Sequence, residues 1–543
     1  MFKIGIDFDN TIACYDQSFG EVAKLIGLQE GEGLTSSKVE IKALILARPA
    51  GDMVWQQLQG KVYGKHMQQA DVFPGFHEFL YLSKLRGNEV FIVSHKSEFG
   101  HFDEERVPLR EQALAWLRKT GILQGNEFSL DRHNIFFEAT REEKLKRICE
   151  LACSHFVDDL SEVFEERLFP TAVSKILFRP SPARFVDPDF FCISSWRQLT
   201  YKLYGGWSET DIRDAAQVIF PDLGISQVKH CSGRSNSRVY KLTGNLQGHF
   251  LLKIYPDRQL DSRPRIETEF AASQELISRL YPVANPVVVD KNLGWAVFKW
   301  VEGDSIGCSP DEQFLNNAFE FIQRLYFDSR DLNGFDQFPE ASEACFCGFE
   351  IVQQIQRRIQ KLLRVDSEAL KTFLDRELIP YFAVVTRVAE DRAGQLFSVP
   401  LDRTLQIPSP SDFGSHNALR DRNGVVTFID FEYFGWDDPV KLVSDFYWHP
   451  GMNLSHELRE KWLEKTLVMF KKDLTYSQRL KAYLPLYGLR WCAIILNAYL
   501  KPFTGLQSHE EYLIHGSDEV QSKQLLKANI YLQRVKGLVN GNG

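Results

Sequence analysis

The sequence has no excess of positive charge. Its 64 lysine and arginine residues are outnumbered by 72 aspartate and glutamate residues, and the formal net charge is −8 at pH 7. Proteins that bind nucleic acid usually carry a basic excess that neutralises the phosphate backbone. We therefore expect no nucleic-acid partner.

The sequence also lacks the marks of a secreted or membrane protein. Its nine cysteines are scattered, without the paired CxxC spacing of a structural zinc site. The opening segment MFKIGIDFDN reaches two acids by Asp9. No apolar run approaches the roughly 20 residues that a membrane span requires. These absences predict a cytoplasmic protein with reduced thiols and no membrane partner.

What is present predicts two domains. The chain has 543 residues, whereas an ordinary domain has roughly 100 to 200. A polar segment that contains Gly205 and Gly206 separates two differently patterned parts, and there is no internal repeat. We predict one domain at residues 1–203 and a second at residues 204–543.

The first part alternates short apolar runs with helical spacing. The runs FKIGID, NEVFIVSHK and SHFVDDL each end in polar residues, and longer stretches with helical periodicity lie between them. This alternation predicts an α/β domain with a parallel, doubly wound sheet. Ligands bind at the carboxyl ends of the strands in such sheets.

Polar side chains follow the predicted strands at their carboxyl ends. Asp7 and Asp9 come directly after the first run, and in an extended turn these alternate carboxylates can flank one phosphate. Taken alone, a DxDxT pattern is more typical of a solvated turn than of a site. Its companions favour a site, and they follow in the order Thr11, Ser94, Lys144, Asp158 and Asp159.

This set resembles the four motifs of the haloacid dehalogenase (HAD) superfamily over roughly residues 1–200. The resemblance implies a Rossmann-like phosphatase in which Asp7 is the nucleophile and Asp9 is the general acid and base. It also implies that Thr11 and Ser94 hold the phosphoryl oxygens and that Lys144 neutralises the nucleophile. Magnesium would be bound by Asp7, Asp9, Asp158 and Asp159.

Residues 14–70 have a helical pattern, and by the same resemblance they form a cap over the site. Cys14, Tyr15 and Lys65 could reach the site from this cap, although core or surface roles fit them better. His95 and Lys96 lie beside Ser94, where substrate contact and a turn role are both open.

The second part changes from strands to helices. Residues 228–301 are strand-rich around one helix at 267–280, and the chain from residue 311 is mostly helical apart from a loop-and-strand segment at 408–435. We predict an α+β bilobal domain with an N-lobe at about residues 213–302 and a C-lobe at about 303–543.

The segment PSDFGSHNAL, followed by VVTFIDF, carries the most specific signal in the second part. Asp412 and Asn417 lie five residues apart, and a strand then ends in Asp430. These residues can supply one base and two metal ligands. The pattern resembles the catalytic loop of aminoglycoside phosphotransferases and choline-kinase-like enzymes, which have a protein-kinase-like fold. The resemblance implies that Asp412 orients and deprotonates the acceptor hydroxyl, while Asn417 and Asp430 hold magnesium against ATP.

The nucleotide site follows from the same resemblance. Lys253 matches the lysine that contacts the phosphates, Glu269 is its predicted helix partner, and Glu267 is the rival candidate. The loop at 232–237, including Ser235, would cover the phosphates. Trp300 and Val301 match the connection between lobes where adenine binds.

One departure concerns the catalytic loop. Many family members have His and Gly just before the catalytic Asp, whereas this chain has Pro410 and Ser411. His416 is a candidate to replace the missing His as the brace of the loop. Asp445 is also expected to brace the loop by hydrogen bonds.

The leading hypothesis is a bifunctional enzyme. The first domain would hydrolyse a phosphate monoester with Mg²⁺, and the second would phosphorylate a hydroxyl of a sugar, amino alcohol or related small molecule with ATP and Mg²⁺. An alternative keeps one domain catalytic, as a phosphatase or a kinase, and makes the other a ligand-sensing or scaffolding module. The sequence assigns no oligomeric state.

Overall fold

The computed structural model divides the chain into two compact units. The first comprises Met1–Gly233, Val239–His249 and Asp290–Trp295, and the second comprises Arg234–Arg238, Phe250–Val289 and Ala296–Gly543. The residues that the structure describes are 1–25, 27, 38–102, 105–180, 190–231, 237–245, 248–256, 261, 263–331, 334–500 and 518–541.

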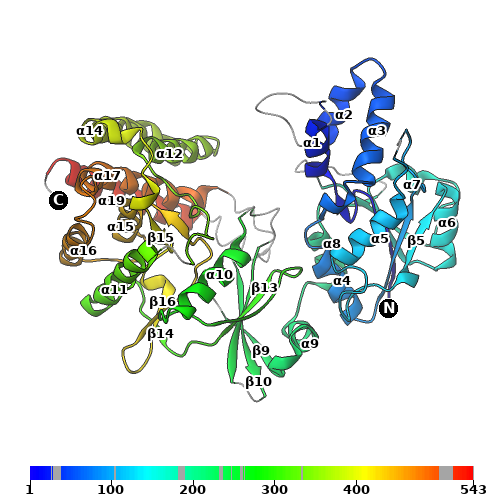
Figure 1. Ribbon diagram of the computed structural model, residues 1–543, viewed down its shortest axis with the longest axis horizontal. Coiled ribbons are helices and arrows are strands. Elements are labelled where there is room, and N and C mark those ends of the chain that lie inside the picture. The colour runs from blue at the N-terminus through cyan, green and yellow to red at the C-terminus, as the bar shows by residue number, and fades with distance from the viewer. Residues whose placement is uncertain are drawn as a thin grey trace. The chain divides into compact units, whose positions relative to one another are not determined.

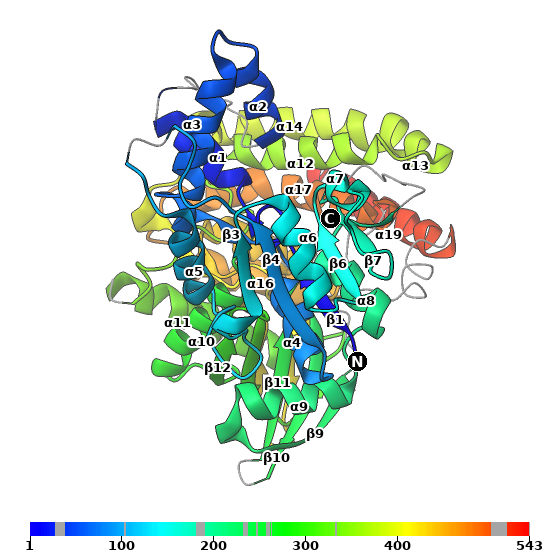
Figure 2. The same cartoon turned by 90° about the vertical axis from the view of Figure 1, so that its right-hand side faces the viewer.

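The first unit is built on a parallel six-stranded sheet. Its strand order is β5-β4-β1-β6-β7-β8, and every neighbouring pair is parallel, as the sequence predicts. Strands β4, β1, β6 and β7 lie side by side in Figure 2. The strands are β1 Lys3–Ile6, β4 Glu89–His95, β5 Ile135–Glu138, β6 His155–Asp158, β7 Ser174–Phe178 and β8 Phe191–Ile193.

Helices pack against this sheet, and their buried apolar residues form the core together with those of the strands. Leu145 and Ile148 of one helix pack with Phe91, Val93 and Phe156 of the strands, which removes apolar surface from water. The helices are α4 Phe76–Leu85, α5 Leu109–Lys119, α6 Arg141–Glu150, α7 Ser161–Glu165, α8 Trp196–Tyr204 and α9 Glu209–Ile219.

Gly5 of β1 lies opposite Phe156 of β6. A Cβ atom at Gly5 would lie 2.6 Å from the ring of Phe156. The glycine therefore leaves room for this ring to pack over β1.

A helical insertion leaves the sheet after β1. It begins and ends in an antiparallel pair, with Ala13 opposite Val72 and Cys14 opposite Asp71. Helices α1, α2 and α3 lie together in Figure 1, where the sequence predicts a cap. The elements are β2 Ala13–Cys14, α1 Asp16–Leu25, α2 Lys38–Leu46, α3 Gly51–Tyr63 and β3 Asp71–Val72.

Helix α8 ends at Tyr204, and Gly205 follows with a left-handed φ of 70°. Helix α9 and the antiparallel hairpin of β9 (Ile225–Cys231) and β10 (Arg238–Gly244) come next. Most of this segment is counted with the first compact unit. The division into domains at Tyr204 therefore stays a prediction.

The second unit combines a small sheet with many helices. Strands β11 His249–Ile254, β13 Trp295–Lys299 and β12 Pro286–Asp290 are neighbours in that order, and helix α10 Arg265–Ser278 falls where the sequence predicts one. The later strands are β14 Asp304–Ser305, β15 Ile407–Ser409, β16 Ala418–Arg420, β17 Val426–Phe428 and β18 Gly435–Asp437.

Helices make up most of the remainder. They share one apolar core that includes Phe321, Phe413, Phe446 and Trp462. No helix among the described residues is both long and apolar enough to span a membrane. The helices are α11 Glu312–Asp328, α12 Gly348–Leu362, α13 Glu368–Phe373, α14 Ile379–Ala393, α15 Pro439–Trp448, α16 His456–Met469, α17 Tyr476–Ile495 and α19 Asp518–Val539.

Candidate phosphoryl-transfer sites

In the first unit, a buried lysine joins the ends of two neighbouring strands. Asp7 follows β1, Asp158 ends β6, and Lys144 lies in the first part of α6. The Nζ of Lys144 donates to Asp7 Oδ1 at 2.7 Å and to Asp158 Oδ2 at 2.6 Å. Thr140 and Glu143 form a capping box at the start of α6, which fixes the helix end that presents the lysine.

The three acids near this lysine are crowded. Oxygen atoms of Asp7, Asp158 and Asp159 lie within 4.8 Å of one another. Burial, together with Asp158 and Asp9, raises the pKa of Asp7 to about 7 against the opposing effect of Lys144. Burial, together with Asp7 and Asp158, raises the pKa of Asp159 to about 8. Carboxylates that repel one another in this way suit a hard divalent cation such as Mg²⁺.

The turn after Asp7 holds the second acid, Asp9. Lys96 Nζ lies 2.9 Å from Asp9 Oδ2, and the hydroxyl of Tyr15 donates to Asp9 Oδ1. Asn10 has a left-handed φ of 58°, a conformation that asparagine tolerates better than most residues. The structure therefore places Asp9 beside the cation Lys96.

Thr11 and Ser94 are both buried. The hydroxyl of Thr11 has no hydrogen-bond partner within the described part of the chain, while its carbonyl accepts from Trp196 Nε1 at 2.9 Å. A buried hydroxyl usually has a partner. The contact of Thr11 with a phosphoryl oxygen stays a prediction.

The other candidates of the first unit divide into two groups. Tyr15 and Lys96 contact Asp9, so both lie at the site. Lys65 instead forms an exposed ion pair with Glu105, and His95 contacts the carbonyl of Ala139 at 3.0 Å. His95 is exposed and has this local contact, and both roles that the sequence left open remain predictions.

In the second unit, Lys253 is the centre of another buried cluster. Its Nζ lies 2.6 Å from Glu269 Oε2, 2.6 Å from Asp430 Oδ1 and 3.2 Å from Glu432 Oε2. Lys253 comes from β11 and Glu269 from α10. The structure thus pairs Lys253 with Glu269 rather than with its rival Glu267.

Burial dominates the electrostatics of this cluster. It raises the pKa of Glu269 to about 7, although Lys253 opposes the shift. Burial alone would lower the pKa of Lys253, but Asp430 and Glu269 raise it above its usual range. Arg265 forms a further ion pair with Glu432. Lys253 is therefore a fixed cation in an acidic, dry environment.

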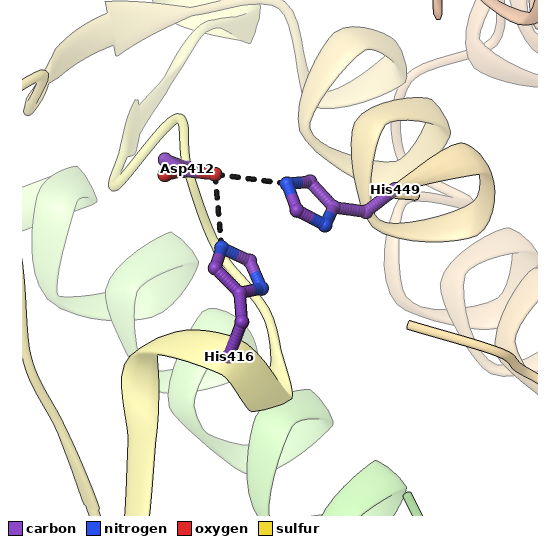
Figure 3. Close-up of side chains that lie close together, drawn as sticks. All are labelled: Asp412, His416 and His449. Atoms are coloured by element: carbon purple, nitrogen blue, oxygen red, sulfur yellow. Dashed lines mark hydrogen bonds and ion pairs between the residues drawn. The ribbon is translucent and has the colours of Figure 1, made fainter. Parts of the chain in front are cut away.

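Asp412 does not belong to the Lys253 cluster; it is hydrogen-bonded to two histidines. Figure 3 shows His416 and His449 directed at the same carboxylate oxygen, Oδ1, and each Nε2 is 3.0 Å from it. The two imidazole rings stack with centroids 3.9 Å apart and an angle of 1° between their planes. Burial alone would raise the pKa of Asp412, but the hydrogen bonds from both histidines lower it well below its usual range.

The second nitrogen of His449 defines its tautomer. The backbone N–H of Gly451 donates to Nδ1 of His449 at 3.0 Å, so the proton of the neutral ring is on Nε2. Burial lowers the pKa of His449, which favours this neutral form. His449 is therefore a donor to Asp412 rather than a metal ligand, although Asp412, His416 and His449 are close enough to hold an ion.

Asn417 and Asp430 lie on adjoining segments. The backbone N–H of Ile429 donates to the carbonyl of Asn417 at 3.0 Å, and the Asn417 amide donates to the Asp412 carbonyl at 2.9 Å. Because Nδ2 is engaged in this way, Oδ1 of Asn417 is the atom that could bind a cation. An amide oxygen and the Asp430 carboxylate are hard ligands that fit Mg²⁺.

The other residues predicted for the nucleotide site are Trp300, Val301 and Ser235. Trp300 and Val301 directly follow β13, and Val301 packs against an apolar cluster that includes Tyr255, Ala296 and Phe298. Ser235 lies outside the described residues.

The prediction for Asp445 was wrong in its detail. Asp445 accepts hydrogen bonds from Arg490 and Trp491 and pairs with Lys441, rather than bonding to the loop that carries Asp412. Asp445 is connected to Asp412 through two other side chains. Trp491, which donates to Asp445, packs edge-on against His449 with ring centroids 4.7 Å apart. The sequence analysis missed His449 and Glu432 since neither belongs to the quoted motif.

No protein-family model matches the chain, and no curated protein matches it. Solved structures that resemble it include ethanolamine kinase from Plasmodium vivax, with 11% identity, 62% of this chain and 94% of that chain covered, and a TM-score of 0.38. Choline kinase from Cryptosporidium parvum has 12% identity, covers 62% and 97%, and has a TM-score of 0.41. Spectinomycin phosphotransferase in complex with ADP and spectinomycin has 9% identity, covers 60% and 99%, and has a TM-score of 0.40. These scores are low, so the case for a function depends on the side chains themselves.

Proposed function

We propose that the second unit transfers the γ-phosphoryl group of ATP to a hydroxyl of a small molecule. The observation that supports this most strongly is the anionic Asp412 held by two histidines, in the same unit as the cluster of Lys253, Glu269 and Asp430. Phosphoryl transfer needs a group that positions the nucleophile and cations that stabilise the phosphates. The two sets of side chains supply both.

In this reaction the acceptor oxygen attacks the γ-phosphorus, the bond to the bridging oxygen of ADP breaks, and the hydroxyl proton passes to Asp412. Oδ1 of Asp412 accepts from both histidines, whereas Oδ2 accepts from the Asn417 amide at 3.3 Å. Oδ2 would therefore be the oxygen offered to the acceptor hydroxyl. Lys253 would contact the phosphates, and Glu269 would hold it in place. Mg²⁺ held by Asn417 and Asp430 would neutralise negative charge on the phosphates of ATP.

The kinase proposal is tested by ADP release from the full-length protein with ATP and Mg²⁺. The acceptor panel should contain amino alcohols, aminoglycosides and neutral sugars. We expect at least one acceptor to stimulate ADP release and to gain a phosphate. Nucleotide binding without acceptor-stimulated release across the panel would contradict the proposal and favour a ligand-sensing module.

We propose that the first unit hydrolyses a phosphate monoester, as a HAD-like phosphatase. The supporting observation is the buried contact of Lys144 with both Asp7 and Asp158 at the carboxyl edge of a parallel sheet. Asp7 would attack phosphorus and release the alcohol, to which Asp9 gives a proton. Asp9 would then take a proton from the water that hydrolyses the aspartyl-phosphate to inorganic phosphate.

Asp7, Asp158 and Asp159 would hold Mg²⁺ in this unit, where it would offset the charge of the phosphoryl group. The test is phosphate release from p-nitrophenyl phosphate by the full-length protein, with Mg²⁺ and with excess chelator. We expect turnover that the chelator abolishes and Mg²⁺ restores. Absence of turnover with Mg²⁺ for this and other simple esters would contradict the phosphatase proposal.

A further inference from the structure

The helical insertion of the first unit brings its own lysine to the acid site. Lys38, the first residue of α2, donates to Asn10 Oδ1 at 2.7 Å and contacts the hydroxyl of Tyr63 at 3.2 Å. Asn10 lies between Asp9 and Thr11 in the turn that follows β1. A residue of the insertion thus reaches the turn that carries the reactive acids.

Lys38 differs from the other two lysines of the site in its partners. Lys144 pairs with Asp7 and Asp158, and Lys96 pairs with Asp9. Among the described residues, the hydrogen-bond acceptors of Lys38 are the neutral groups of Asn10 and Tyr63. No carboxylate accepts a hydrogen bond from Lys38 within the described part of the chain, although Asp159 and Asp9 are near enough to raise its pKa. An anion supplied by a ligand could therefore make the direct contact that no acid of the described chain makes.

The surroundings of Lys38 would strengthen such an interaction. Its Nζ lies 5.2 Å from the ring centroid of Phe19 and 5.8 Å from that of Tyr63. Lys96 Nζ lies 5.3 Å from the same Tyr63 ring. Aromatic neighbours reduce the access of water, and attraction between charges grows as water is excluded. Burial opposes its charge, but Tyr63, Asp159 and Asp9 raise the pKa of Lys38, so it is a cation at neutral pH.

The partners of the other charged groups in the site also leave Lys38 available to a ligand. Lys144 and the divalent cation would serve the transferred phosphoryl group, and Lys96 is already matched by Asp9. Of these three lysines, Lys38 is the one whose hydrogen bonds to described residues go to neutral groups. We propose that Lys38 binds a second anionic group of the substrate, so that the first unit prefers phosphate monoesters that carry a carboxylate or a second phosphate. This inference rests on the proposed phosphatase activity.

The test compares matched esters on the full-length protein with Mg²⁺. Glycerol 3-phosphate and 3-phosphoglycerate differ by a carboxylate, and fructose 6-phosphate and fructose 1,6-bisphosphate differ by a phosphate. We expect kcat/KM to be higher for at least one of the two doubly anionic esters. Lys38→Met should reduce that preference about 10- to 100-fold, since hydrogen bonds to charged groups contribute about 1.5–3 kcal/mol, mainly through KM. The pair that shows the preference identifies the second group.

Two further variants separate charge from structure. Lys38→Arg keeps the cation and should retain most of the preference. Lys42→Met is the matched control, because Lys42 is an exposed residue of the same helix whose Nζ lies 5.8 Å from the Trp55 ring, and it should retain the full preference.

Two outcomes would overturn the inference while leaving the phosphatase proposal intact. One is equal kcat/KM for the members of both pairs in the wild-type protein. The other is a Lys38→Met protein that slows all four esters equally, which would make Lys38 a structural link between insertion and turn. Failure to hydrolyse any ester would instead contradict the phosphatase activity itself.

Discussion

The two units bury a lysine among carboxylates in similar ways, yet the aspartates that we propose to be reactive have different partners. In the first unit, Lys144 contacts the proposed nucleophile Asp7 directly at 2.7 Å. In the second, Lys253 contacts Glu269 and Asp430, whereas Asp412 accepts from two histidines. A buried cluster of lysine and acids therefore does not by itself define what the reactive acid does.

Burial and neighbouring groups shift the pKa values of Asp7 and Asp412 in opposite directions. Burial and nearby acids raise the pKa of Asp7 to about 7, while the two histidines lower the pKa of Asp412 despite its burial. Asp7 is thus a carboxylate whose charge Lys144 stabilises only in part, which suits a nucleophile. Asp412 is a well-stabilised anion, which suits a group that orients a hydroxyl.

The largest expected effects come from removing one reactive carboxylate at a time. Asp7→Asn should reduce phosphate release at least about 1000-fold and leave acceptor phosphorylation near wild type, and Asp412→Asn should do the reverse. Each variant serves as the folding control for the other reaction. Loss of both reactions in either variant would contradict two separate sites.

Replacing the lysines should have a smaller effect on rate. Lys144→Met should slow phosphate release about 100-fold, comparable with the loss of one stabilising donor, and Lys253→Met should slow phosphoryl transfer from ATP to a similar extent. Each change also leaves buried acids unpaired, at a cost of about 3–5 kcal/mol measurable by denaturant unfolding.

Exposed lysines near each cluster provide controls for these variants. Lys146 lies on α6 with a side chain that is 77% exposed, and Lys299 is exposed at the end of β13. Lys146→Met and Lys299→Met should behave as wild type in both assays. If these controls lost as much activity as Lys144→Met and Lys253→Met, the clusters would have no special role.

His449 is expected to act as a positioning residue for Asp412. His449→Ala removes one donor from Oδ1 and should lower kcat of the kinase reaction about 10- to 100-fold, with little change in KM for ATP. His449→Gln can still donate and should recover part of kcat. The control is His456→Ala, an exposed residue at the start of α16. A change confined to KM for ATP would contradict the positioning role.

The smallest effect concerns acid stability of the second unit. Burial alone would raise the pKa of Glu343, but Arg358 and Arg490 lower it to about 2 from the ordinary 4.5. A depressed pKa in the folded state contributes stability above about pH 4.5 that is lost as the pH falls toward 2. The difference in free energy of unfolding between wild type and Glu343→Gln should therefore shrink from pH 6 to pH 3. A constant difference over this range would contradict the assignment.

The sequence predicted the parts of the sites that follow from local patterns. The convergence of Asp7 and Asp158 could be predicted because the carboxyl ends of parallel strands share one edge of a sheet. Lys38 and His449 could not, since each reaches its partner from a separate element, 28 and 37 residues away along the chain. Such contacts depend on tertiary packing, and no local periodicity encodes them.

The most direct test of the contrast between Asp7 and Asp412 is whether phosphate becomes covalently attached to either residue. The full-length protein should be mixed with a phosphate monoester or with ATP and an acceptor, quenched in acid, and mapped by peptide mass spectrometry. We predict phosphate on the Asp7 peptide with the monoester and none on the Asp412 peptide under either condition. Phosphate on Asp412, or ester hydrolysis that proceeds with Asp7 unmodified at every time point, would contradict the account.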